Sequence, residues 1–164
     1  MKKTIIFVFA ALVLAGRPVR VAAQAVPDVV SVPSELKRVI VVRFKYNTDL
    51  LDGLQQAVKS QKIKNAVILS GVGSVTRYRV HAVSSTTLPA KLAYSEHTGP
   101  MDLIAVQGYV LGGRIHAHIT MTDDQKALGG HLHEGTTVFT FAIVTLGVLD
   151  DNADLSRFDD SNWR

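Results

Sequence analysis

Four of the six histidines lie within eighteen residues, in two pairs of the form His-x-His: His116 with His118, and His131 with His133. Neutral imidazole is the side chain best suited to hold zinc and similar metals. In a strand, alternate side chains leave the same face about 6.6 to 7 Å apart. The imidazoles of one pair can therefore lean onto one ion at a bond length of roughly 2.0–2.1 Å. The spacing predicts a metal site built from two neighbouring stretches of backbone.

The number of histidine ligands decides what such a site can do. Three ligands leave zinc one position for water or substrate, which is typical of a catalytic site, whereas four close the shell and favour a structural role. We expect His116, His118 and His131 to hold zinc or another divalent metal. His131 is preferred over His133 because Gly129-Gly130, which requires either a positive φ or a close backbone approach, should position it most tightly.

Several polar residues beside the pairs are candidates for supporting roles. His133 and Glu134 are candidate additional ligands or outer-sphere hydrogen-bond acceptors, and Asp123 and Asp124 could also fix imidazole tautomers. Arg114 could pair with a substrate carboxylate, although a surface arginine is the simpler interpretation. The remaining histidines, His81 and His97, stand alone in the sequence and are interpreted as structural or surface residues.

The histidine pairs need strands to hold them, and β-branched, alternating segments recur along the chain. They predict strands at residues 37–44, 66–70, 75–83, 91–97, 102–111, 114–122 and 136–148. One helix is predicted from Asp49 to Gln61, capped by Asn47 or Thr48, because its apolar residues fall on one face. Glycine-containing turns are expected at 71–73, 98–100 and 112–113. Many strands, one helix and short connections predict an α+β fold with a largely antiparallel sheet.

The first 25 residues have the pattern of a signal peptide. Lys2 and Lys3 precede an apolar run, residues 4–15, that is too short for a transmembrane helix of about 20 residues. Ala23-Gln24-Ala25 matches an A-x-A cleavage site, so export to the periplasm or medium is expected, with no stable membrane insertion after cleavage. The alternative is an uncleaved N-terminal anchor. Residues 26–35 should then be a linker or arm, 36–149 one domain, and 150–164 an acidic, polar tail that is loose except where Phe158 or Trp163 docks.

Export also removes the apparent basic character of the chain. Residues 1–25 hold four of the 18 lysines and arginines and none of the 14 acidic residues, so the remainder balances at 14 against 14. A neutral domain lacks the electrostatic footprint of a nucleic-acid binder. The absence of cysteine excludes disulfides and thiolate ligands. Gly71-Val-Gly73 lacks the third glycine and the helix of a dinucleotide loop, and no G-x-S-x-G motif supports a serine nucleophile.

The motif His116-x-His118, an Asp-containing turn, then Gly129-Gly130-His131-Leu132 and Gly135 resembles the PPC domain, the domain shared by plants and prokaryotes. Residues 49–54, 66–75 and 102–108 also resemble the first helix, glycine-containing strand and following strand of that family. The resemblance covers about residues 36–149. It implies a compact domain similar to acetolactate decarboxylase, assembled as a homotrimer, with zinc ligands at His116, His118 and His131.

The resemblance also has limits. Plant members bind the A·T-rich minor groove through a separate Arg-Gly-Arg-Pro hook, whereas Ala15-Gly16-Arg17-Pro18 lacks the first arginine and lies in the predicted leader. In the family, the strand after the GGHL motif often carries a glutamate, whereas residues 141–145 contain no acidic residue.

Three functions follow as hypotheses. The first is an exported, zinc-binding homotrimer of unassigned activity. The second is a metal-dependent lyase or hydrolase that polarises the carbonyl of a small molecule. The third, disfavoured by the neutral charge, is DNA binding through basic residues, namely Lys37, Arg38, Arg43, Arg77 and Arg79.

Overall fold

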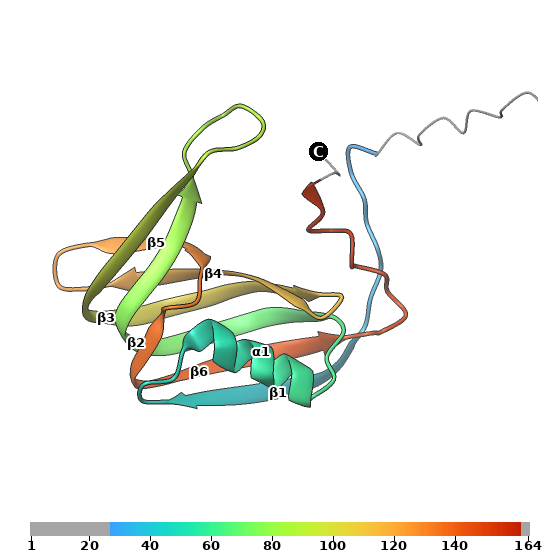
Figure 1. Cartoon of the computed structure of the whole chain (residues 1–164). Helices are drawn as coiled ribbons and strands as arrows, with labels where there is room; N and C mark the ends of the chain where they lie inside the picture. Colours follow the sequence, from blue (N-terminus) through green and yellow to red (C-terminus); the bar gives the residue numbers. More distant parts are fainter. Residues whose placement is uncertain (1–26, 162–164) are drawn as a thin grey trace, which may run out of the picture.

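The computed structural model describes residues 27–161, so the predicted leader and Trp163 lie outside the described residues. One helix and six strands follow each other in the order β1 (Leu36–Lys45), α1 (Leu50–Ser60), β2 (Ala66–Val83), β3 (Leu92–Leu111), β4 (Arg114–Thr122), β5 (Ala127–Leu132) and β6 (Thr137–Leu149). The strands form one antiparallel sheet in the order β1-β6-β2-β3-β4-β5. The predicted α+β class is confirmed (Figure 1).

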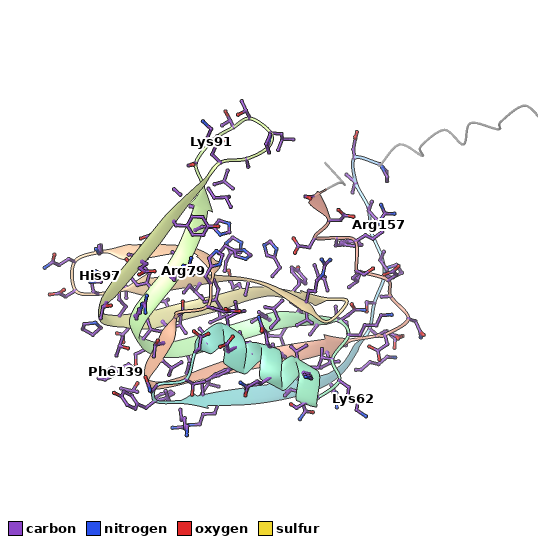
Figure 2. The ribbon with its side chains drawn as sticks, in the orientation of Figure 1. Lys62, Arg79, Lys91, His97, Phe139 and Arg157 are labelled. Carbon is purple, nitrogen blue, oxygen red and sulfur yellow. The ribbon has the colours of Figure 1, made fainter. Side chains whose placement is uncertain are left out.

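The sheet closes on itself at the end that carries the histidines. β2 pairs with β6 and β3 along much of its length, and its distal part also pairs with β5, at Val80 with Leu132 and His81 with His131. A closed circuit of pairings therefore runs through β2, β3, β4 and β5. Beyond it, β2 and β3 continue together as a projecting ribbon (Figure 1), with Lys91 on the loop that joins them (Figure 2).

α1 covers one face of the sheet and shields the core. Its apolar side buries Leu50, Leu54 and Val58, as the sequence pattern predicted. The predicted cap is wrong: Asp49 is the N-cap, and its Oδ1 accepts hydrogen bonds from the backbone N–H groups of Leu51 (3.0 Å) and Asp52 (3.1 Å). A carboxylate there satisfies helix N–H groups that would otherwise lack partners.

Two of the predicted glycine turns, at residues 71–73 and 98–100, are instead parts of continuous strands. Residues 66–83 form one strand, and residues 92–111 form another. Register shifts near Gly73 show that the extra backbone is absorbed as bulges. Gly73 has φ of 153°, and a side chain on it would strike the backbone of Phe141 in β6. Glycine at position 73 therefore allows β2 and β6 to pack closely. The predicted turn at Gly112 and Gly113 is confirmed, with φ of 59° and 80°.

The segment after β6 packs against the domain over more of its length than we expected. Ala153 and Leu155 are buried with Leu111 in a small second core. Asn65, itself fully buried, donates from Nδ2 to the carbonyl of Ala153 (2.7 Å). These contacts hold residues 150–161, here named the C-terminal segment, alongside the arm that precedes β1 (Figure 1). Within residues 27–161, no helix has the length and apolar character needed to cross a membrane.

Candidate metal centre

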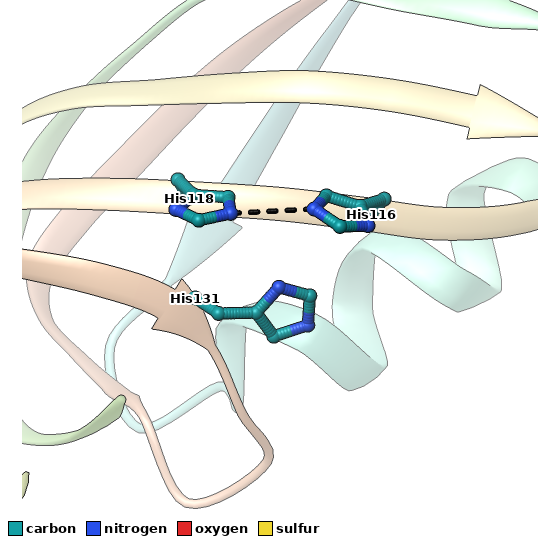
Figure 3. Close-up of side chains that lie close together, drawn as sticks. All are labelled: His116, His118 and His131. Atoms are coloured by element: carbon teal, nitrogen blue, oxygen red, sulfur yellow. Dashed lines mark hydrogen bonds between the residues drawn. The ribbon is translucent and has the colours of Figure 1, made fainter. Parts of the chain in front are cut away.

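The three predicted ligands converge on one point. His118 on β4 lies directly opposite His131 on β5, and His116 precedes His118 on the same face of β4. One ring nitrogen from each histidine lies within 4.8 Å of the other two (Figure 3). The His131 ring stands nearly perpendicular to the rings of His116 (88°) and His118 (85°). The nitrogens therefore surround a common centre, as the spacing predicted.

The separation of these nitrogens fits a metal ion. His116 Nε2 and His118 Nε2 are 3.2 Å apart. Two nitrogens bound to tetrahedral zinc at 2.0–2.1 Å would lie about 3.3 Å apart. The donor set is three neutral nitrogens, which suits zinc and neighbouring transition metals. The His116 and His118 nitrogens thus have the spacing of two zinc ligands, and a His131 nitrogen lies within 4.8 Å of both.

Gly129 and Gly130 allow β5 to pack closely against β4 and β2, which places His131 beside His118. A Cβ on Gly130 would lie 2.6 Å from the carbonyl oxygen of His81 in β2, and a Cβ on Gly129 would strike the carbonyl oxygen of Ile119 in β4. The sequence left two explanations open for these glycines, a positive φ or a close backbone approach. The structure shows that they permit close backbone approach on both sides of β5.

The surroundings favour the unprotonated form of two candidate ligands, His118 and His131. Burial, followed by the positive charges that the neighbouring histidines would carry, lowers the pKa of His131 from 6.5 to about 4. Burial and the adjacent His116 also lower the pKa of His118. Charged imidazolium is disfavoured where water is scarce and like charges are near. These rings are therefore free to donate a nitrogen lone pair at neutral pH.

A second pair of histidines lies beside the first group. His81 Nδ1 is 2.6 Å from His133 Nε2, and the His81 ring stacks on that of His131 at 4.7 Å. His133 therefore contacts the site without joining the three-nitrogen group, and Glu134 is exposed. His81, which stands alone in the sequence and was interpreted as a structural or surface residue, thus lies against the candidate site. Fifty residues separate it from His131, and only the pairing of β2 with β5 brings them together.

The sequence reasoning also missed Asp159. Its Oδ1 lies 2.8 Å from His116 Nδ1, whereas Asp123, a predicted acceptor, receives the backbone N–H groups of Gln125 and Lys126 in the turn between β4 and β5. Arg114 donates to the carbonyl of Ser156 (2.8 Å). No sequence signal links Asp159 to a histidine 43 residues away, because the contact depends on how the C-terminal segment folds back.

A groove of about 630 Å³ opens beside His116 and His118. Tyr109 and Leu149 form its floor on the sheet, and its walls come from the arm and the C-terminal segment, through Val32, Ser34, Leu155, Phe158 and Asp159. Arg157 lies on the same segment (Figure 2). His116 and His118 are therefore accessible to a small molecule from the groove.

Fold and site together define a small α+β protein with a candidate metal-binding pocket. The chain belongs to the Plants and Prokaryotes Conserved domain family, whose model matches residues 32–150. This is the PPC domain to which the histidine and glycine motifs pointed.

The chain is also similar in fold to solved structures, and in sequence to part of one curated protein. A metal-containing protein from Archaeoglobus fulgidus is 18% identical, with a TM-score of 0.68 over 77% of this chain and 89% of that one. A plant- and prokaryote-conserved protein from Pyrococcus horikoshii is 23% identical, with a TM-score of 0.61 over 73% and 85%. The bifunctional protein GlmU of Synechococcus is 26% identical over 115 residues, and the chain spans 18% of its length.

Proposed function

We propose that this PPC-domain protein binds zinc through His116, His118 and His131. The observation that carries the proposal is the convergence of three imidazole nitrogens within 4.8 Å of one another. The metal content of the structural neighbour from Archaeoglobus fulgidus supports it. Three ligands would leave zinc a position for water or a small molecule. Two of the three, His116 and His118, line the groove beside β4.

Metal analysis of the purified chain tests the proposal directly. Wild-type protein should contain close to one zinc per chain after extensive dialysis, and His118→Ala should lose most of it. His97→Ala is the matched control, because His97 lies on β3 outside the three-nitrogen group. Equal zinc in the wild type and His118→Ala would contradict the site.

A lyase or hydrolase activity is the second candidate, favoured by the groove that opens beside two of the three ligands. Bound zinc would supply a Lewis acid that polarises a substrate carbonyl. The chain would bind and orient the substrate in the groove. Turnover of 2-hydroxy-2-methyl-3-oxo acids that is abolished by a chelator and by His118→Ala would support this activity, whereas chelator-resistant turnover would contradict it.

Trimeric assembly belongs to the same proposal and has support in the uncovered face of the sheet. The face opposite α1 exposes apolar side chains, including Val39, Val41, Leu69, Val72, Ile104 and Phe141. Exposed apolar patches of this kind mark surfaces that associate. Mass measurement in solution by light scattering tests the assembly, and a monomer at micromolar concentration would contradict it.

Export remains a proposal that rests on residues 1–25. Sequencing the N-terminus of the mature chain tests it, with Val26 expected as the first residue. DNA binding is not favoured, because several of the basic residues proposed for it have other partners. Lys37 pairs with Glu35 at 2.8 Å, and Arg77 pairs with Glu96 at 3.0 Å.

A further inference from the structure

The C-terminal segment places a carboxylate against one of the proposed ligands. Asp159 Oδ1 lies 2.8 Å from His116 Nδ1, and His116 Nε2 faces His118 Nε2 at 3.2 Å. A carboxylate accepts from a ring N–H, so Nδ1 of His116 carries the proton. Nε2 is then left with a free lone pair that points into the three-histidine group.

Asp159 lies on the C-terminal segment, which other contacts than the one with His116 hold against the domain. Arg114 Nη2 donates to the carbonyl of Ser156, and Asn65 Nδ2 donates to the carbonyl of Ala153. Leu155 packs into the small core with Leu111. Because these contacts fix the backbone on both sides of Leu155, Asp159 does not depend on His116 to hold the segment in place.

We propose that Asp159 is a positioning residue of the metal centre: its carboxylate fixes the tautomer and orientation of His116 so that Nε2 binds the metal. This inference rests on the proposed zinc site. The family model matches residues 32–150, so Asp159 lies beyond the matched domain. The segment that follows the domain thus completes the metal site and also forms one wall of the groove beside it.

Carboxylates that hydrogen-bond to metal-bound histidine orient the ring and raise its basicity, and their loss typically weakens metal affinity 10- to 100-fold. Asp159→Asn should therefore bind zinc and cobalt(II) at least tenfold more weakly than the wild-type full-length chain, as measured by competition with a chelator. Asp159→Glu should recover part of the affinity. Asp151→Asn is the matched control, because it removes the same charge from the same segment and keeps the backbone carbonyl that Lys64 contacts.

The tautomer of His116 gives a readout that does not depend on bound metal. In the metal-free wild type, nitrogen NMR should show His116 protonated at Nδ1, and this preference should weaken in Asp159→Asn with thermal unfolding unchanged. Affinities of Asp159→Asn and Asp151→Asn that agree within twofold would overturn the inference while leaving the zinc site intact. A wild-type chain that takes up no zinc would overturn both proposals.

Discussion

At the scale of single residues, the site depends on imidazoles held in their neutral form. The pKa of His131 lies near 4 in the folded chain, against 6.5 for an exposed histidine. Burial also lowers the pKa of His81, His118 and His133. Such a cluster is costly to protonate, and metal binding removes the competing proton altogether. The close spacing of these imidazoles, which suits a metal ion, therefore also makes the stability of the metal-free protein sensitive to acid.

We predict that the metal-free chain loses stability as pH falls from about 6.5 to about 4. Over this window the unfolded chain takes up a proton at His131 that the folded chain excludes, so protonation favours unfolding. The ring is partly exposed and solvent screens the effect, so the expected loss for this residue is on the order of 1–2 kcal/mol. Urea unfolding with chelator present, at several pH values, measures it.

His131→Gln is the comparison for this prediction, because it keeps a polar side chain that does not titrate. Its stability should change less between pH 6.5 and 4 than that of the wild type. His81 and His118, whose pKa is also lowered, should leave some dependence in place. An identical pH profile in both proteins would show that His131 is not the residue responsible.

A buried amide ties the C-terminal segment to the domain. Asn65 is fully buried, donates to the carbonyl of Ala153 and accepts from the N–H of Gly112 (3.1 Å). We predict that Asn65→Ala lowers the free energy of unfolding by about 1–3 kcal/mol, since the buried carbonyl of Ala153 and the N–H of Gly112 lose their partner. Chemical denaturation measures the loss. Asn152→Ala, at an exposed position, should stay within about 0.5 kcal/mol of the wild type.

At the scale of elements, the position of β5 decides whether the three nitrogens meet. This strand of six residues lies between β4 and the distal part of β2, and it carries His131 at the point where both pairings coincide. Asp49 holds the following loop in place, because its Oδ2 accepts from the N–H of Gly135 (2.6 Å) while Oδ1 caps α1. The Asp49 carboxylate thus links α1 to the loop that follows β5.

We predict that Gly130→Ala destabilises the fold by about 1–3 kcal/mol and weakens zinc binding at least tenfold. The new Cβ would lie 2.6 Å from the carbonyl oxygen of His81, and overpacking of this kind forces backbone shifts. Because those shifts separate β5 from β2, His131 should move away from its partners. Thermal unfolding and chelator competition measure the two effects.

Gly99→Ala is the matched control for that substitution. There the nearest contact would be 2.8 Å to the end of the His97 side chain, which can rotate away. Its stability and zinc affinity should stay near those of the wild type. Equal behaviour of the two alanine variants would mean that close backbone approach at Gly130 does not position His131.

At the scale of the whole molecule, the sheet is protected on one side only. α1 covers one face, and the opposite face presents a row of exposed apolar side chains at its centre. Ile104 and Val72 are each about half exposed, at 53% and 51%. A surface of this composition is better buried against further copies of the chain, as the proposed trimer would require.

We predict that Ile104→Asp converts the assembly to monomers, because a charge buried at an apolar interface has no compensating partner. Light scattering gives the mass, and circular dichroism should show that the strands are retained. Val29→Asp, on the exposed arm, should leave the assembly unchanged. An Ile104→Asp protein with the same mass as the wild type would exclude this face as the interface.

The strand-rich fold, the single helix and the His-x-His pair on β4 could be predicted from local periodicity. Alternation marks the strands, and His-x-His places two imidazoles on one side of β4. His131 was expected to join them from residue type and spacing, and the pairing of β4 with β5 brings it there. Consecutive glycines at 129 and 130 predicted either a positive φ or a close backbone approach, and the structure shows the close approach.

The surroundings of these histidines depend on long-range packing that the sequence does not reveal. The pairing of β2 with β5 brings His81 against His131, and the return of the C-terminal segment brings Asp159 to His116. β2 and β3 likewise run on as single strands through glycines where turns were predicted, because the neighbouring strands pack against them there. These contacts join residues about 40 to 50 positions apart, and such separations leave no periodic trace, because they depend on how whole elements pack.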